Sequence, residues 1–163
     1  MKLTQKITYP AGPEAVYAMQ TEKRVREEAC TRSGALSYEV TVSRDGDTAR
    51  VQIDRSMPAA VPEFVRKFIG DKVNIRQVEE WGAPDSTGTR TAKLRVTIQG
   101  QPATMDGSIV STPSGAETVA QIDGEVKVAV PFLGKKIEPE IHKAILAAIR
   151  VDHEVGSEWL TKQ

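Results

Sequence analysis

Residues 135–163 read KKIEPEIHKAILAAIRVDHEVGSEWLTKQ and repeat apolar side chains with the spacing of a helix. At 100° per residue, the apolar side chains of this stretch fall on one face. That face holds Ile141, Ile145, Ala148, Ile149, Val155 and Trp159. We therefore expect a long helix over Lys135–Gln163 that lies on an apolar surface.

Two carboxylates interrupt this face. Asp152 falls near its middle and Glu138 beside it, with His142 at the rim. A carboxylate in a protein core costs several kcal/mol unless it is paired, protonated or hydrated. Asp152 therefore predicts one of two arrangements: a partly hydrated cavity under the helix, or an ion pair with an Arg or Lys of a strand. For Glu138 we expect a place in the first helical turn, where the macrodipole favours a negative charge.

The length and charge of the chain narrow its class. A chain of 163 residues fits one domain, and its 22 Lys and Arg balance its 22 Asp and Glu. This balance gives no reason to expect a nucleic-acid partner or an anionic membrane surface. No apolar run is long enough for stable membrane insertion, and no signal sequence is recognisable, so we expect a cytoplasmic protein.

The reactive side chains give no sign of a metal or cofactor site. Cys30 follows Glu27 and Glu28, whose charges oppose a thiolate, so an incidental buried thiol is expected rather than a nucleophile. His142 and His153 stand about three helical turns apart, too far to share one metal ion. We therefore expect no metal and no cofactor.

The first part of the chain predicts a strand, two helices and a later helical insertion. Residues 2–9 alternate between polar and apolar side chains, which is typical of a half-buried strand. Pro13 begins a short helix, and a second, charged helix runs to about Arg32. Pro62 precedes a short helix over Glu63–Ile69 with two of the three phenylalanines. We expect this insertion to complete the core rather than to act as a lid.

Two hairpins follow from alternation around turn residues. Asp45-Gly46 predicts a type I′ turn, and Gly100 predicts a type II′ turn that pairs Val96 with Met105. The first turn gives the pairs Val42–Ala49, Val40–Val51 and Tyr38–Ile53. Gly107 and Gly124 lie on the apolar faces of later strands, where they either let the strands bend or leave room for a ligand.

This order of elements resembles that of the START-like superfamily (SRPBCC), which includes polyketide cyclases, lipid-transfer domains and the birch-pollen allergen family. The stretch YPAGPEAVYAMQTE (9–22) resembles the strand-to-helix entry of these proteins, and residues 128–160 resemble their last strand and helix. The segment 62–70, Trp81 and the ending from Val130-Pro131-Phe132 to Trp159 are similar to an uncharacterised bacterial family of that superfamily.

The resemblance implies an α+β helix-grip fold as a single domain over residues 1–163. In this fold a curved antiparallel sheet of about seven strands wraps around a long C-terminal helix, and two short helices follow the first strand. It also implies an apolar cavity for a lipid, polyketide or aromatic compound between sheet and helix. The residues expected to line it are Tyr38, Val40, Val51, Ile53, Phe64, Phe68, Leu94, Val96, Met105, Ile122, Val126, Ile141, His142, Ile145, Ile149 and Asp152.

Three functions remain open at this point. The favoured one is binding or transport of a hydrophobic small molecule, with Tyr38, Asp152 and His142 orienting its polar group. The second is a cyclase- or dehydratase-like enzyme with His142 or Asp152 as general acid or base, but no compact acid–base pair is recognisable and no catalytic residue is assigned. The third is a closed-core interaction domain, whose core would use the same aliphatic residues. A second titratable group beside Asp152 in a hydrated cavity would favour the enzyme hypothesis. A filled interior would favour the interaction-domain hypothesis. The oligomeric state is not predicted.

Overall fold

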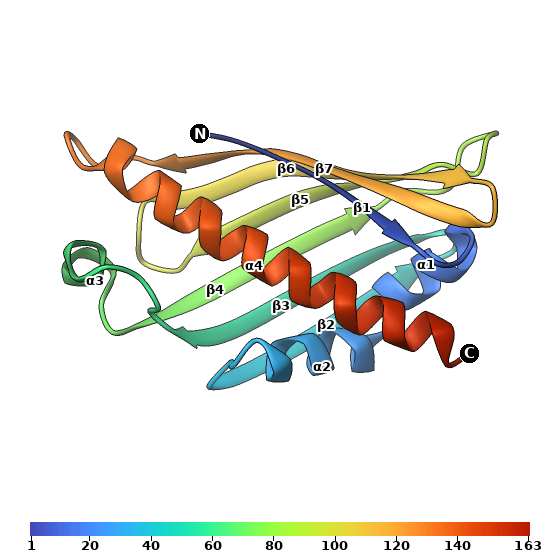
Figure 1. Cartoon of the computed structure of the whole chain (residues 1–163), viewed down its shortest axis with the longest axis horizontal. Coiled ribbons are helices and arrows are strands. Elements are labelled where there is room, and N and C mark those ends of the chain that lie inside the picture. The colour runs from blue at the N-terminus through green and yellow to red at the C-terminus, as the bar shows by residue number, and fades with distance from the viewer.

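The structure, a computed structural model, describes all 163 residues. Seven strands form one antiparallel sheet in the order β1-β7-β6-β5-β4-β3-β2, and α4 crosses one face of that curved sheet (Figure 1). The strands are β1 (Lys2–Tyr9), β2 (Ser37–Asp45), β3 (Thr48–Pro58), β4 (Lys72–Trp81), β5 (Arg90–Ile98), β6 (Ala103–Ser114) and β7 (Glu117–Val128). The helices are α1 (Pro13–Gln20), α2 (Lys23–Arg32), α3 (Glu63–Ile69) and α4 (Gly134–Thr161). The predicted helix-grip arrangement is confirmed.

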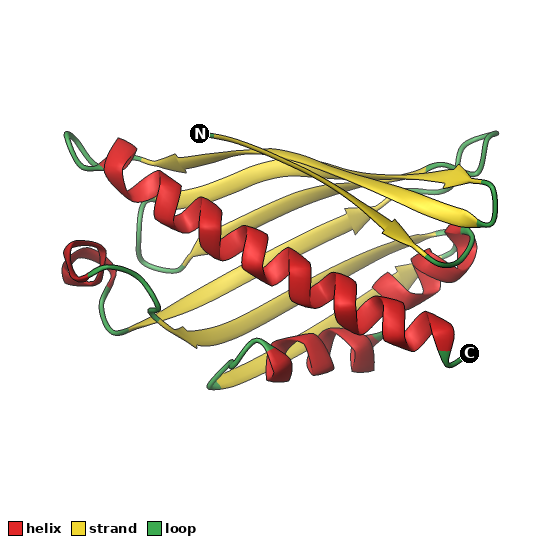
Figure 2. Cartoon of the chain, viewed as in Figure 1, coloured by secondary structure: helices red, strands yellow, loops and turns green.

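The three short helices, α1, α2 and α3, are distributed unevenly along α4. Figure 2 shows α1 and α2 beside the C-terminal half of α4, while α3 lies near the opposite end of the molecule. The predicted pair of helices after the first strand is present, with Glu22 as N-cap of α2, where its carboxylate accepts from the Arg24 backbone N–H at 3.4 Å. The sheet is therefore covered by α2 along its β2 edge and by α4 across its middle.

The two hairpins test the predicted registers. In the β5–β6 hairpin, Val96 pairs with Met105, as predicted. In the β2–β3 hairpin, Val42 pairs with Val51 and Val40 with Ile53, so the observed register differs by two positions from the predicted one. A type I′ turn needs positive φ at both central residues, but only Gly46 has one (59°), and the turn closes as Gly46-Asp47. A shift of two leaves the inward side chains on the same face.

Gly107 and Gly124 face each other across β6 and β7. A Cβ on Gly107 would lie 2.0 Å from the carbonyl oxygen of Asp123, and one on Gly124 would lie 2.5 Å from Cε of Met105. These two glycines thus leave no empty space on the sheet. They allow a close approach of the two strands where the sheet bends over α4.

The start of α4 differs from the expectation for Glu138. The helix begins at Gly134, so no acidic residue lies in its first turn, and Glu138 is not the helix-start residue that was predicted. Its carboxylate instead lies 3.6 Å from the amino group of Met1. The side chain of Glu138 therefore joins the start of α4 to the start of β1 rather than interacting with the helix dipole.

Apolar side chains form two clusters under the helices. The larger cluster is covered by α1, α2 and the C-terminal half of α4, and the smaller one lies near α3. Val65 and Ile69 of α3 are buried in the smaller cluster and Phe68 packs against it, whereas Phe64 is 48% exposed. The insertion thus contributes to a core, mainly through Val65 and Ile69.

Candidate functional site

A cavity of about 490 Å³ lies between the sheet and α4. Of the 35 residues that line it, 24 are hydrophobic. Residues of both apolar clusters contribute to its wall, including Ile69 and Val73 from the smaller and Leu94 and Met105 from the larger. Its volume and apolar wall are in the range of small-molecule sites in proteins.

Eight of the sixteen residues expected at a ligand site line this cavity. They come from the middle of the sheet and from one face of α4: Leu94, Val96, Met105, Ile122, Ile141, Ile145, Ile149 and Asp152. The other eight lie elsewhere: Tyr38, Val40, Val51, Ile53, Phe64, Phe68, Val126 and His142. Contact of any of these residues with a ligand remains a prediction.

Five of the eight residues away from the cavity contact other parts of the protein. Val40, Val51, Ile53 and Val126 are buried in the larger apolar cluster, so their side chains contact protein rather than the open space. Tyr38 is 39% exposed, and its hydroxyl accepts from Thr31 Oγ1 of α2 at 3.1 Å. Because α2 rather than α4 covers β2, inward positions of that strand do not reach the cavity.

One end of the cavity is polar. Arg26 of α2 and Glu79 of β4 form an ion pair there through Nη2 and Oε1, and both side chains are almost fully buried. Glu79 also accepts from Gln77 Nε2 at 2.7 Å and from Trp81 Nε1 at 2.9 Å. A buried charge pair is tolerated when the remaining lone pairs are satisfied in this way. Glu79 is thus held by three donors.

Asp152 of α4 faces the same polar end. Its Oδ2 lies 3.8 Å from Nη1 of Arg26, no hydrogen bond reaches it, and 30% of its side chain is accessible. Asp152 is also one of the residues that line the cavity. Burial raises the pKa of Asp152, while Arg26 and Arg55 act against the shift. A place at a cavity and an ion pair were expected as alternatives for Asp152, and the structure shows both. The partner in the ion pair, Arg26, belongs to a helix rather than to a strand.

Two further side chains have shifted pKa values at this end. Burial raises the pKa of the Tyr9 hydroxyl, and Asp152 adds to that shift. For Arg26, burial alone lowers the pKa of the guanidinium, but Glu79 and Asp152 reverse the effect and raise it. Arg26 is therefore a permanent cation at the cavity wall.

Two buried polar atoms at this end have no hydrogen-bond partner in the protein. They are Nε of Arg26, a donor, and Oε1 of Gln20, an acceptor. Both residues line the cavity. Buried polar groups are nearly always hydrogen-bonded, but neither of these atoms is accessible to solvent, so they are unsatisfied groups of the protein rather than open contacts for a bound molecule.

Arg26, Arg55, Gln77 and Glu79 are not among the residues expected from the sequence, although one pattern could have revealed two of them. In β4 the side chains that point inward are Val73, Ile75, Gln77, Glu79 and Trp81, which alternate with outward ones. A glutamine and a glutamate on the apolar face of a strand predict a buried polar site. Arg26 follows Val25 in a helix rich in charged residues, and no periodic pattern of apolar residues in that helix distinguishes Arg26 from the charged residues on its surface.

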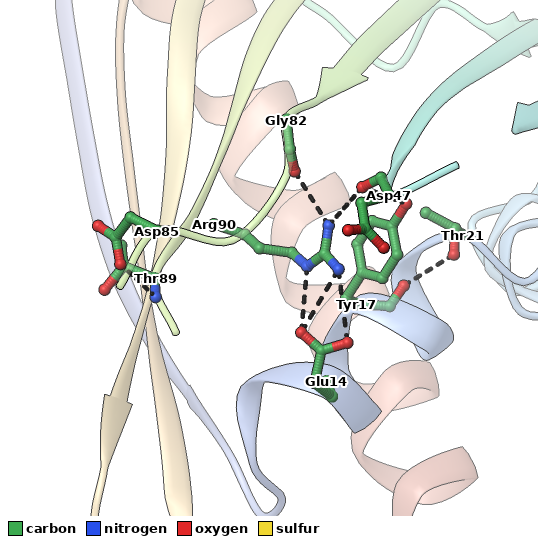
Figure 3. Close-up of polar contacts among 8 residues, drawn as sticks. All are labelled: Glu14, Tyr17, Thr21, Asp47, Gly82, Asp85, Thr89 and Arg90. Carbon is green, nitrogen blue, oxygen red and sulfur yellow. Dashed lines mark hydrogen bonds and ion pairs between the residues drawn. The ribbon is translucent and has the colours of Figure 1, made fainter. Parts of the chain in front are cut away.

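A second buried arginine lies outside the cavity (Figure 3). Arg90 donates from Nη1 to the carbonyl oxygens of Asp47 at 2.7 Å and Gly82 at 3.0 Å. Its Nε and Nη2 each contact the Glu14 carboxylate at 3.4 Å, and its guanidinium lies 3.5 Å from the centre of the Tyr17 ring. Arg90 thus fastens α1 to the loops that follow β2 and β4.

The remaining reactive groups add no further site. Cys30 is buried, and burial raises the pKa of its thiol. No cluster of three or more His, Cys, Asp and Glu side chains is arranged to hold a metal ion. None of the four helices is both long and apolar enough to cross a membrane.

Comparison with known proteins gives a family match and a fold match. Residues 4–160 match the sequence profile of a family described as "Protein of unknown function (DUF2505)". Among curated proteins, the uncharacterized protein Rv0481c of Mycobacterium tuberculosis is 24% identical over 121 residues, which is 72% of this chain and 68% of that protein.

Two solved structures illustrate the fold match. TTHA0849 from Thermus thermophilus superposes with a TM-score of 0.64 at 18% identity and covers 99% of this chain and 98% of its own. The ZhuI aromatase/cyclase from a Streptomyces species has a TM-score of 0.62 at 8% identity, covering 99% and 94% of the two chains. The protein thus has the START-like helix-grip fold.

Proposed function

The chain belongs to the DUF2505 family, and from this membership and its helix-grip fold we propose that it binds a hydrophobic small molecule in the cavity under α4. The observation that carries the proposal is the cavity itself, about 490 Å³ in volume with 24 hydrophobic residues among the 35 that line it. Burial of an apolar ligand there would be favourable by about 25 cal/mol for each Å² of apolar surface removed from water.

The distribution of polar groups supports a ligand with two different ends. Most of the wall is aliphatic and comes from β4 to β7 and α4, whereas Arg26, Glu79 and Asp152 form one charged cluster; the other charged pair in the lining is Lys143 with Glu140. A mostly apolar pocket with a few polar groups that orient the ligand is typical of small-molecule sites. Lipids, polyketides and aromatic compounds with one polar group all have this character.

The proposal is tested by native mass spectrometry of the purified protein, followed by organic extraction and identification of any co-purifying compound. In parallel, Nile red, a neutral apolar dye, is titrated into the protein, and its fluorescence reports binding. The variant Ala148→Trp fills the cavity from α4, and Glu154→Trp places the same side chain on an exposed position of that helix. We expect Ala148→Trp to abolish dye binding and Glu154→Trp to retain it. Equal binding by both variants would contradict the proposal.

A second candidate function, acid–base catalysis in the same cavity, is favoured by one observation. Asp152 lines the cavity with a raised pKa, and a second titratable group, Glu79, is nearby. Glu79 is engaged by Arg26, Gln77 and Trp81, which leaves Asp152 as the candidate acid or base. The compound identified by extraction is incubated with the protein and with Asp152→Asn. Turnover that is lost in the variant while binding persists would establish the enzyme.

A further inference from the structure

We propose that the polar end of the cavity recognises a carboxylate, so that the bound molecule is an anionic amphiphile whose head group contacts Arg55. This inference rests on the proposed function, because it specifies the class of ligand for the same cavity. The apolar remainder of the wall accommodates the hydrocarbon part of such a molecule.

Arg55 carries the argument because it is a cation without a carboxylate partner. It lies on the inward face of β3, two positions after Ile53, and it lines the cavity. Its Nη1 donates to Oε1 of Gln77 at 3.3 Å, its side chain also interacts with the Cys30 thiol, and no carboxylate lies within ion-pair distance of it. A guanidinium presents five donors in a planar fork that matches a carboxylate, so most of the Arg55 donors remain free.

The neighbouring arginine is not equivalent. Arg26 is paired with Glu79, whose oxygens are already shared with Gln77 and Trp81. Of the charges at this end, Arg55 has no ion-pair partner, and Asp152 has only Nη1 of Arg26, 3.8 Å from its Oδ2. The planar fork of the Arg55 guanidinium suits a carboxylate better than it suits an ammonium group.

Asp152 makes the recognition dependent on pH. The charged and titratable side chains that surround it are Tyr9 of β1, Arg26 and Cys30 of α2, Arg55 of β3 and Glu79 of β4. Two carboxylates that share one site cannot both remain ionised easily, so a bound carboxylate stabilises the protonated form of Asp152. Where Asp152 is ionised before binding, one proton passes from solvent to its carboxyl group. The affinity for a carboxylate ligand then falls as the pH rises.

The test compares three ligands with the same chain and different head groups: decanoate, decanol and decyltrimethylammonium. Each displaces Nile red from the wild-type protein, and we expect decanoate to bind most tightly and the cation least. Displacement by none of the three, with no dye binding either, would contradict the proposed function. Equal displacement by decanoate and decanol, or a preference for the cation, would leave the binding function intact and overturn the carboxylate inference.

A pair of variants assigns the effect to Arg55. Arg55→Met removes the inward cation, and Arg50→Met removes an exposed arginine from the same strand. We expect Arg55→Met to weaken decanoate binding about tenfold or more, the order of a charge-assisted hydrogen bond. The affinity of Arg55→Met for decanol and the affinity of Arg50→Met for decanoate should stay unchanged. Unchanged decanoate affinity in a folded Arg55→Met protein would overturn the inference.

Calorimetry in two buffers of different ionisation enthalpy measures proton uptake independently of any variant at Arg55. We expect decanoate binding to take up protons at neutral pH and decanol binding to take up none. The Asp152→Asn protein should bind decanoate without proton uptake. Uptake that persists in Asp152→Asn would contradict the role of Asp152.

Discussion

Arg26 and Glu79 form a buried ion pair across 53 positions of sequence, with 7% and 2% of their side chains exposed. The pair ties α2 to the middle of the sheet, and its members line one end of the cavity. The same contact therefore supports the fold and forms the polar end of the proposed site.

Replacing Glu79 by Gln should destabilise the protein strongly. The amide keeps the shape of the carboxylate but leaves the buried Arg26 cation with only the Asp152 carboxylate, 3.8 Å away, and loss of one partner of a buried ion pair typically costs about 3–5 kcal/mol. Urea unfolding followed by circular dichroism measures the loss. Glu80→Gln, at the adjacent exposed position of β4, is the matched control and should change the free energy of unfolding by about 0.5 kcal/mol or less. Similar values for the two variants would show that the ion pair contributes little.

Replacing Asp152 by Asn should stabilise the protein at neutral pH. Burial raises the pKa of this carboxyl above its ordinary value of 3.8, so the folded state binds its proton more tightly than the unfolded state. The contribution of Asp152 to the free energy of unfolding is fully present below pH 3.8 and is lost as the pH rises through the folded-state pKa. In thermal melts from acidic to neutral pH, the difference between the melting temperatures of the wild-type and Asp152→Asn proteins should grow as the pH increases. A constant difference across that range would contradict the expected shift.

Replacing Arg90 by Met should destabilise the protein without removing the cavity. The change deletes the contacts to Glu14, to the carbonyls of Asp47 and Gly82 and to the Tyr17 ring (Figure 3). Hydrogen bonds to charged groups contribute about 1.5–3 kcal/mol, and we expect a loss of about that size or larger. Nile red should still bind the folded variant, because Arg90 does not line the cavity.

The control for this change is Arg95→Met, which alters an exposed residue of the same strand. It should shift the unfolding free energy by about 0.5 kcal/mol or less. Loss of dye binding in folded Arg90→Met, with Arg95→Met normal, would mean that the α1 anchor also shapes the cavity.

Replacing Gly107 by Ala should cost more than replacing Gly124 by Ala. The added Cβ at Gly107 meets the backbone oxygen of Asp123 at 2.0 Å, whereas at Gly124 the nearest atom is Cε of Met105, at the end of a flexible side chain. Overpacking typically costs about 1–3 kcal/mol, and a side chain can move away more readily than a strand. Urea denaturation of both variants gives the comparison. The reverse order would place the tight contact at Met105.

The sequence predicts most of the fold because its local patterns are unambiguous. The β5–β6 register follows from Gly100, the one residue there suited to positive φ, and the structure gives it a φ of 78°. The stretch Asp45-Gly46-Asp47 allows two turn positions, since either pair of neighbours can occupy the centre, and the predicted position is the wrong one. Local sequence could not distinguish them, because both keep Val40 and Val51 on the inner face.

The polar end of the site is harder to predict because its members come from distant segments. Arg26, Arg55, Glu79 and Asp152 belong to α2, β3, β4 and α4, and they meet through the packing of α2 and α4 over the sheet. Asp152 is recognisable in the sequence because it interrupts a long apolar face, and Glu79 because it lies with Gln77 on the apolar face of β4, whereas no pattern singles out Arg26 or Arg55. The sequence does not show that α2 covers β2, so it could not distinguish the inward residues of that strand from residues of the cavity wall.

The pairing of β1 with β7 has a consequence for biosynthesis. Lys2 lies opposite Glu125, so the first strand to be translated has no sheet partner until β7 has been made. Helix α4 is translated later still, and until then the apolar face of the sheet has no cover across its middle. A nascent chain therefore exposes strand edges and the future cavity wall until β7 and α4 have been made, and such unpaired edges and apolar surface are prone to aggregate.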